Sequence, residues 1–266
     1  MREPTRKAAE KVEPKLRTRR SKGEKAHRKR MATVAAVYTI APFVRTPDDV
    51  LAALRFCDEQ PAAALERKKR PRPEHKRVWA NVTEPVEHVI HELFAEAMDR
   101  GADKRNLVAL VDGNEVQLGD ILVTAEEYQL SVTVIIDFIH VLEYVWRAGT
   151  AFHPEGTKAL EAWVHERMRR ILSGEASRVA GAIRRSATRR KISGAARTAV
   201  DACANYLIKY QSFMRYDEYL AAGYPIATGV IEGACRYLVK DRMEITGARW
   251  SLAGAEAVLR LRSLRA

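Results

Sequence analysis

The spacing of apolar residues predicts alternating strands and helices in the first part of the chain. Residues 31–42 combine β-branched and aromatic residues and stop at a proline, which predicts a buried strand. Thr46-Pro47-Asp48-Asp49 predicts a helix start, because proline favours the first helical position and acids favour the first turn. Residues 60–75 are rich in proline, lysine and arginine, which predicts an exposed linker. Apolar residues at helical spacing over 86–97 predict an amphipathic helix that ends near Gly101.

Two further apolar runs predict strands, and each carries an aspartate near its end. The first run, Asn106–Leu118, contains Asp112-Gly113-Asn114, and Asp-Gly between apolar runs favours a hairpin turn in which the aspartate has no chemical role. The second run, Ser131–Ile136, leads into a helix that Asp137 can cap, with His140 as a partly buried structural histidine. Strands and helices in this order fit an α/β sheet covered by helices on both faces.

The second half of the chain is predicted to be helical. Apolar residues recur at helical spacing through 150–222, and the arginine clusters between them either follow a DNA backbone or only solvate a helix surface. Thr228 can cap a later helix, whose apolar positions begin at Val230. On the opposite face Glu232, Arg236 and Lys240 follow at intervals of four residues, a spacing that favours a row of ion pairs.

The net charge of the chain narrows the classes of molecule that it is expected to bind. The chain has 46 Lys and Arg against 34 Asp and Glu, a formal charge of +12 over 266 residues. Residues 1–30 alone hold 13 Lys and Arg against four Glu, so this basic arm carries most of the excess. Such a distribution points to a polyanion, and nucleic acid is favoured over an anionic membrane surface.

The cysteines and the apolar runs of the sequence bear on the cellular compartment of the protein. The three cysteines, at positions 57, 203 and 235, form no CxxC pair, which favours a reducing cytosol and argues against a zinc site. No apolar run is long enough to span a membrane, and the N-terminus lacks the apolar segment of a secretory signal. We therefore expect a cytoplasmic protein.

Several ordered blocks of the chain carry recognisable motifs. Tyr224–Trp250 contains GVIE, which ends at Glu232, and later GARW. The other matching blocks are Lys29–Val50, Leu107–Asn114, Val134–Gly149 and the LRSLR tail at Leu261–Arg265. Together these blocks resemble bacterial insertion-sequence transposases of the DDE class, in the Kra-type group related to Mutator-like transposases. The resemblance spans nearly the whole chain.

The resemblance implies a fold and a reaction. The fold would be α/β, with an RNase H-like mixed sheet flanked by helices and an all-helical insertion before the last catalytic helix. The segments would be a basic arm (1–30), the first part of the core (31–149), the helical insertion (150–222) and the C-terminal core helices (223–266). The reaction would be cleavage and transfer of DNA strands, dependent on Mg²⁺ or Mn²⁺. The partner would be double-stranded DNA, both transposon ends and target, in the bacterial nucleoid, and a homo-oligomer fits such a protein.

Site residues follow from the matched blocks. Asp112 matches the second catalytic carboxylate and Glu232 the last one, so both would be metal ligands. Asp137 with His140 matches a D-x-x-H block, and Asp137 is the alternative second carboxylate. The residues expected to contact DNA phosphates are Arg28, Lys29, Arg30, Arg236, Lys240, Arg242 and Arg249.

The resemblance ends before the front of the family pattern. DDE transposases place a first catalytic Asp on an opening strand, upstream of the stretch that matches Lys15–Arg30, and no strand pattern precedes Met31 here. We therefore expect an N-terminally truncated transposase that does not cleave or join DNA as it stands. The alternative is a non-catalytic DNA-binding protein that uses the basic arm, with Asp112 in a hairpin turn and Glu232 paired with Arg236.

Overall fold

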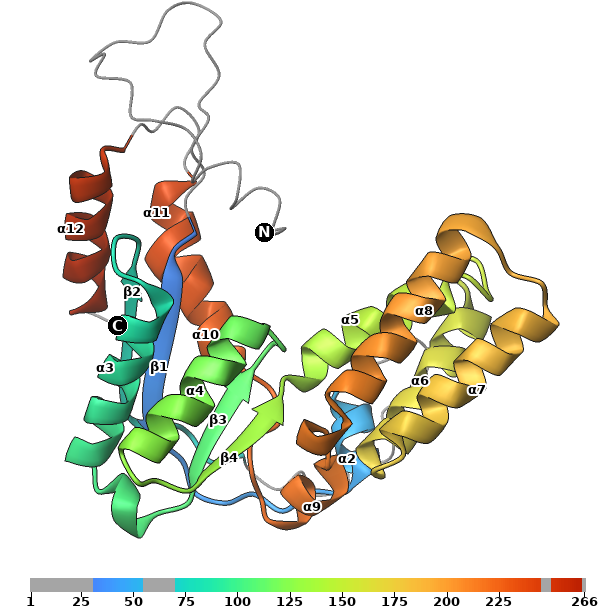
Figure 1. Ribbon diagram of the computed structural model, residues 1–266, viewed down its shortest axis with the longest axis horizontal. Helices are drawn as coiled ribbons and strands as arrows, with labels where there is room; N and C mark the ends of the chain where they lie inside the picture. The colour runs from blue at the N-terminus through green and yellow to red at the C-terminus, as the bar shows by residue number, and fades with distance from the viewer. Residues whose placement is uncertain (1–30, 55–69, 245–249, 265–266) are drawn as a thin grey trace, which may run out of the picture. The chain divides into compact units, whose positions relative to one another are not determined.

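The computed structural model describes residues 31–54, 70–244 and 250–264 (Figure 1). Their elements form two compact units, and each unit is assembled from separate stretches of the chain. Unit 1 takes its residues from Met1–Val37, Lys76–Leu93 and Val230–Ala266, and unit 2 from Tyr38–His75 and Phe94–Gly229. The basic arm, most of the predicted linker and Arg249 lie outside the described residues.

Unit 1 is built around a two-stranded sheet, β1 (Thr33–Thr39) next to β2 (Glu74–Asn81). Its helical elements are the first part of α3 (Val86–Asp99), α10 (Gly229–Ala234), the π-helical turn η3 (Cys235–Lys240), α11 (Asp241–Met243) and α12 (Leu252–Ser263). The core of this unit joins β2 to the C-terminal helices through Val78, Ala80, Ala234, Leu238 and Leu259. Apolar residues that are far apart in sequence therefore close one core.

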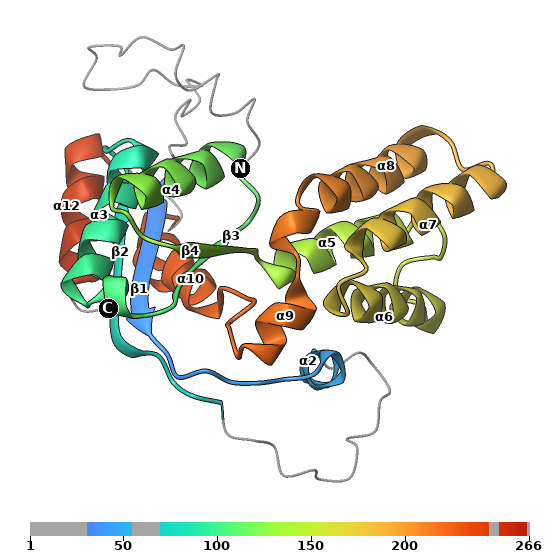
Figure 2. The ribbon, with the colours of Figure 1, turned by 60° about the horizontal axis from the view of Figure 1, so that its bottom comes forward.

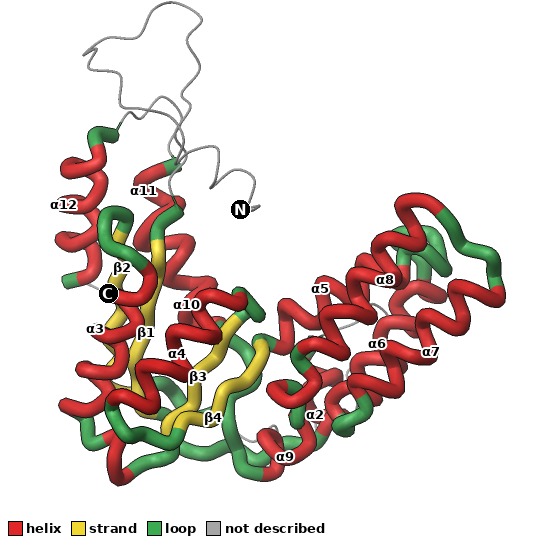
Figure 3. The backbone as a smooth tube through the Cα atoms, viewed as in Figure 1, coloured by secondary structure: helices red, strands yellow, loops and turns green. Residues whose placement is uncertain are grey.

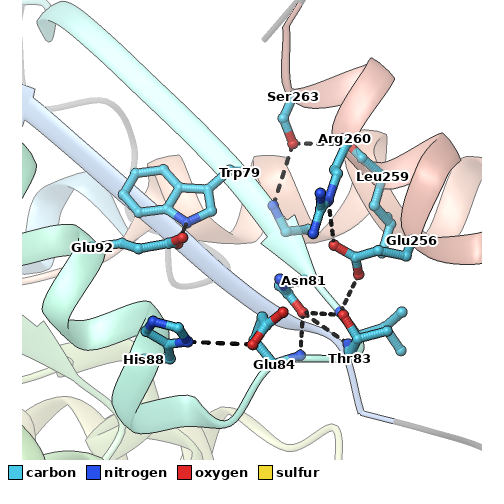
Figure 4. A network of polar contacts seen from close by, with 12 residues as sticks. Trp79, Asn81, Thr83, Glu84, His88, Glu92, Glu256, Leu259, Arg260 and Ser263 are labelled. Atoms are coloured by element: carbon cyan, nitrogen blue, oxygen red, sulfur yellow. Dashed lines mark hydrogen bonds and ion pairs between the residues drawn. The ribbon is translucent and has the colours of Figure 1, made fainter. Parts of the chain in front are cut away.

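Polar contacts reinforce the junction of β2 with α12 (Figure 4). The backbone N–H of Val82 donates to Glu256 Oε2 at 3.0 Å, and Arg260 Nε donates to Glu256 Oε1 at 2.9 Å. The indole N–H of Trp79 donates to Glu92 Oε2 at 2.9 Å and so links β2 to α3. The buried Glu256 carboxylate thus has a donor on each oxygen, as a buried charge requires.

Unit 2 contains a β-α-β unit of β3 (Leu107–Val111), α4 (Glu115–Glu127) and β4 (Val132–Ile136). The two strands are parallel, with a register from Leu107 opposite Val132 to Val111 opposite Ile136. The expected hairpin turn at Asp112-Gly113 is therefore wrong. Asn114 starts a helix there instead, because its side chain accepts the N–H groups of Val116 and Gln117. A helix crossover then makes the returning strand parallel.

The other regular elements described in unit 2 are mostly helices. These helices are α2 (Pro47–Ala53), the end of α3, η1 (Ala102–Lys104), α5 (Phe138–Gly149), α6 (Lys158–Leu172), α7 (Ala176–Arg189), α8 (Gly194–Lys209), η2 (Gln211–Phe213) and α9 (Tyr216–Ala221). Helices α5, α6, α7 and α8 pack side by side (Figures 1 and 2). Each turns an apolar face inward, with fully buried residues such as Leu160, Val179 and Leu207.

The chain is of the α/β class, and helices dominate its described part (Figure 3). Its described strands form two separate sheets of two strands each. The predicted strand after Met31, the helix at Pro47, the amphipathic helix ending before Gly101 and the helices of 150–222 are confirmed. The sequence pattern missed β2, which extends into the segment interpreted as a linker, and it missed α4.

Candidate functional site

Asp112 and Asp137 occupy equivalent positions on neighbouring strands. β3 ends at Val111 and β4 ends at Ile136, and these two residues are partners in the parallel register. The N–H of Asp137 donates to the carbonyl of Val111 at 2.7 Å, which extends the pairing by one step. Both aspartates therefore lie at the carboxyl edge of the β3-β4 pair, where α/β proteins place ligand-binding residues.

Both oxygens of the Asp137 carboxylate accept hydrogen bonds from the protein itself. The side chain is only 5% exposed. Its Oδ1 accepts from the N–H of Ile139 at 2.7 Å and of His140 at 3.4 Å, which caps α5. Its Oδ2 accepts from the N–H of Thr228 at 2.8 Å and also from the Thr228 hydroxyl. Asp137 is thus the helix cap that its position predicts, and it also fixes the approach to α10.

Asp112 has the opposite environment. It is exposed, its Oδ1 accepts only the N–H of Asn114 at 2.9 Å, and within the described ranges its carboxylate pairs with no cation. The following residue, Gly113, has φ of 89°, a conformation that favours glycine. The carboxylate of Asp112 is therefore free to bind a ligand from solvent.

Tyr206 of α8 and Tyr210, the residue directly after this helix, hold the loop that carries Asp112. Tyr206 donates its hydroxyl to the carbonyl of Asp112 at 2.8 Å, and Tyr210 donates to the carbonyl of Gly113 at 2.6 Å. Tyr206 also stacks on Tyr144 of α5, with ring centroids 4.1 Å apart and an interplanar angle of 11°. We call Tyr144, Tyr206 and Tyr210 the tyrosine brace.

Burial affects the central hydroxyl of the brace. It raises the pKa of Tyr206 well above its usual value, and the nearby Tyr144 and Asp112 add to this shift. A Cβ at Gly113 would lie 3.0 Å from the Tyr206 hydroxyl, so the brace also requires a glycine there. The sequence pattern alone did not single out these tyrosines. The spacing of Tyr206 and Tyr210 by one helical turn is the signal that places both side chains on one face.

His140 lies beside the brace and remains partly exposed. Its ring is 5.7 Å from Tyr144 and 6.2 Å from Tyr206, both in edge-on geometry. Its Nδ1 is 3.6 Å from Glu143 Oε2, and its side chain is 37% exposed. The position fits the interpretation of His140 as a partly buried histidine, and it places an imidazole at the same edge as Asp112.

Glu232 lies in unit 1, in the first turn of α10, and is exposed. The expected ion pair between Glu232 and Arg236 is wrong, because the only carboxylate that Arg236 approaches in the described ranges is Asp241, at 4.0 Å. The helix also widens into the π-helical turn directly after Ala234, which alters the spacing that the row of ion pairs assumed. Since Asp112 belongs to unit 2, convergence of Asp112 with Glu232 stays a prediction.

The residues expected to contact phosphate divide between described and undescribed segments. Arg236, Lys240 and Arg242 are exposed, and the Arg242 guanidinium lies over the ring of Trp250 at 5.4 Å. A guanidinium stacked on an aromatic ring keeps its edge free for phosphate. Four further residues, Arg28, Lys29, Arg30 and Arg249, lie outside the described residues.

The donor set allows a partial metal site. Within the described ranges, no three side chains of His, Cys, Asp or Glu gather closely enough to hold a metal ion. Mg²⁺ in phosphoryl-transfer sites is commonly held by one or two carboxylates, with waters and substrate phosphates as its other ligands. Asp112 fits one such position, because its carboxylate is exposed and free of ion pairs.

Comparisons of the chain with family models, curated proteins and solved structures found no match. Among the helices whose placement is described, none is long and apolar enough to cross a membrane.

Proposed function

We propose that this chain is a DNA transposase of the DDE class, with Asp112 and Glu232 as two of the carboxylates that hold Mg²⁺ or Mn²⁺. The observation that carries the proposal is the setting of Asp112. It is an exposed carboxylate at the carboxyl edge of a parallel β-α-β unit, on a loop fixed by the tyrosine brace. The proposal includes an RNase H-like arrangement of the strands and helices and residence near bacterial DNA.

The same setting favours Asp112 over Asp137 as the second carboxylate. A metal ligand needs at least one oxygen lone pair directed to the ion. Both oxygens of Asp137 already accept backbone and hydroxyl donors, and the side chain is buried. Recruiting Asp137 to a metal would uncap α5 and release Thr228, whereas Asp112 can bind without disturbing the fold.

Each residue has a defined task in this proposal. The bound cations would activate the attacking hydroxyl and stabilise the leaving oxygen of the phosphodiester. Asp112 and Glu232 would hold those cations, and the brace would keep the Asp112 loop in place while DNA binds. Arg236, Lys240 and Arg242 would neutralise phosphates of the bound strand.

Manganese binding tests the assignment directly. Free Mn²⁺ is measured by electron paramagnetic resonance in the presence of the full chain and duplex DNA. We expect Asp112→Asn and Glu232→Gln each to weaken Mn²⁺ binding by about tenfold or more, because each removes a charged ligand. Exposed acids elsewhere in the same units provide matched controls, and Asp103→Asn and Glu244→Gln should bind as the wild type does.

The competing function is DNA binding without chemistry, through the basic arm. It is favoured by the lack of a three-ligand metal group in the described part of the chain. Under that function, Asp112→Asn and Glu232→Gln would bind Mn²⁺ like their controls. The genomic DNA on both sides of the gene would then also lack terminal inverted repeats, which an insertion sequence carries.

A further inference from the structure

Helix α7 presents its arginines and its apolar residues on opposite faces. Val179, Ala180, Ile183 and Ala187 are buried against the neighbouring helices α6 and α8. Arg178, Arg185 and Arg189 are exposed. Their spacings of seven and four residues place them in one line along the helix, over a length of about 16 Å at 1.5 Å per residue. We call these three residues the arginine stripe.

No carboxylate pairs with the stripe in the described part of unit 2, whereas several other arginines of that unit have such a partner. Arg169 pairs with Asp48, Arg170 with Glu175, Arg184 and Arg197 with Asp201, and Arg215 with Glu218. Over the described ranges, no Asp or Glu forms an ion pair with a member of the stripe. Glu175 is the acid nearest in sequence. Its carboxylate accepts its side-chain hydrogen bonds from Arg170, and it acts on Arg178 only through a weaker electrostatic attraction.

The acidic residues of the surrounding segment do not neutralise the arginine stripe. Residues 150–222 hold 13 Lys and Arg against seven Asp and Glu. Five of those seven acids are Glu155, Glu161, Glu166, Glu175 and Asp217, and none of them pairs with the stripe among the described residues. Aligned, unpaired cations at one surface raise the local positive potential and favour a polyanionic partner.

We propose that the arginine stripe of α7 binds the phosphate backbone of duplex DNA. Arginine suits this role because its planar guanidinium can contact a phosphate with two N–H donors. A membrane surface fits less well, because an interfacial helix needs apolar residues on its outward face and those of α7 are buried. The choice of DNA over RNA rests on the proposed function, whereas the binding surface does not.

A charge-matched comparison tests the stripe. The triple variant Arg178→Gln/Arg185→Gln/Arg189→Gln removes the stripe, and Arg169→Gln/Arg170→Gln/Arg215→Gln removes three paired arginines from the same unit. Both lose the same formal charge. Fluorescence anisotropy then gives the Kd for a short random-sequence DNA duplex over a range of KCl concentrations, and far-UV circular dichroism verifies folding of both variants.

We expect the stripe variant to bind more weakly and with a shallower salt dependence. Three lost phosphate contacts should reduce the slope of log Kd against log salt by about 2.7, at roughly 0.9 per contact. The control variant should keep a slope close to that of the wild type. Equal slopes for the two variants would overturn the proposal.

Two further probes separate the partners. If loss of the stripe weakens binding to phosphatidylserine vesicles but not to DNA, the surface is a membrane contact and the proposal fails. If it weakens binding to duplex RNA alone, the partner is RNA and the proposal also fails. The Mn²⁺ titration and the salt slope are separate measurements on separate variants. A negative result for the metal assignment therefore does not contradict DNA binding by the arginine stripe. A negative result for the stripe does not contradict the metal assignment.

Discussion

Asp112 and Asp137 each follow directly after one of two paired strands, and their different contacts give them different roles. Asp112 and Asp137 have the same chemistry and the same position in the register. Four donors surround the Asp137 carboxylate, whereas one backbone N–H contacts that of Asp112. A buried carboxylate with several donors stabilises the fold, and an exposed one with few donors is available to a ligand.

This contrast predicts opposite outcomes for the same substitution. Asp137→Asn should lower the free energy of unfolding by about 1–3 kcal/mol, because the new amide N–H₂ faces donors where the carboxylate accepted them. Asp112→Asn should change it by less than about 0.5 kcal/mol, since Asn keeps the acceptor for Asn114 at an exposed position. Urea unfolding followed by circular dichroism measures both. Equal losses for the two variants would contradict this division of roles.

Glu256 predicts how stability in unit 1 depends on pH. Burial raises its pKa, but the N–H of Val82 and the Arg260 guanidinium outweigh burial and leave the pKa below its ordinary value. Its contribution is therefore present above about pH 4.3, the ordinary value for Glu, and is lost as pH falls through the lowered folded pKa.

The test compares the wild type with Glu256→Gln. Gln keeps an acceptor for Val82 but removes the charge that Arg260 contacts. The wild type should be the more stable at neutral pH, and the difference in urea midpoint should shrink as pH falls below about 4. A difference that stays constant from neutral pH to pH of about 3 would show that the charge contributes nothing.

At the scale of elements, α5 and α6 pack tightly against each other in unit 2. A Cβ on Gly149, the last residue of α5, would lie 2.6 Å from Leu160 Cδ1 and 3.1 Å from the ring of Trp163. Leu160 is itself fully buried and has little room to move. Helix α4 provides a contrast, because a Cβ on its exposed Gly119 would meet no atom within 4 Å.

Alanine at these two glycines should therefore have opposite effects. Gly149→Ala should destabilise the protein by about 1–3 kcal/mol through overpacking between α5 and α6. Gly119→Ala should stabilise it by about 0.5–1 kcal/mol, since alanine is the better helix former and the site is open. Thermal unfolding measures both, and stabilisation by Gly149→Ala would mean that the α5-α6 contact is looser than described.

The element boundaries show which signals a sequence carries. The helix at Pro47 was predictable because its cap is local, with Thr46 and Asp49 exchanging hydrogen bonds in a capping box. α4 was missed because an Asp-Gly pair masked the Asn114 cap. β2 was missed because it begins with the charged run Glu74-His75-Lys76-Arg77. Its strand conformation depends on packing against α12, which is distant in sequence.

The candidate site was predictable only in part, for the same reason. The positions of Asp112 and Asp137 at strand ends follow from apolar runs that the sequence displays. The burial of Asp137 depends on Thr228, and the brace depends on α8, and both contacts join residues about ninety positions apart. No local pattern reports such contacts.

At the scale of the whole molecule, the chain crosses between its two units at residues 37–38, 75–76, 93–94 and 229–230. Neither unit is a contiguous stretch of sequence, so a single cut cannot release either one intact. Composition and periodicity describe neighbours in sequence and did not predict this interleaving.

The interleaving fixes an order of assembly during synthesis. Unit 2 is complete once Gly229 has left the ribosome, and it can fold while translation continues. The sheet of β1 and β2 must wait, because Ala234, Leu238 and Leu259, which complete its core, are made last. Until then, β1 and β2 of the nascent chain expose an apolar face. Packing of α10, η3 and α12 on this face buries it.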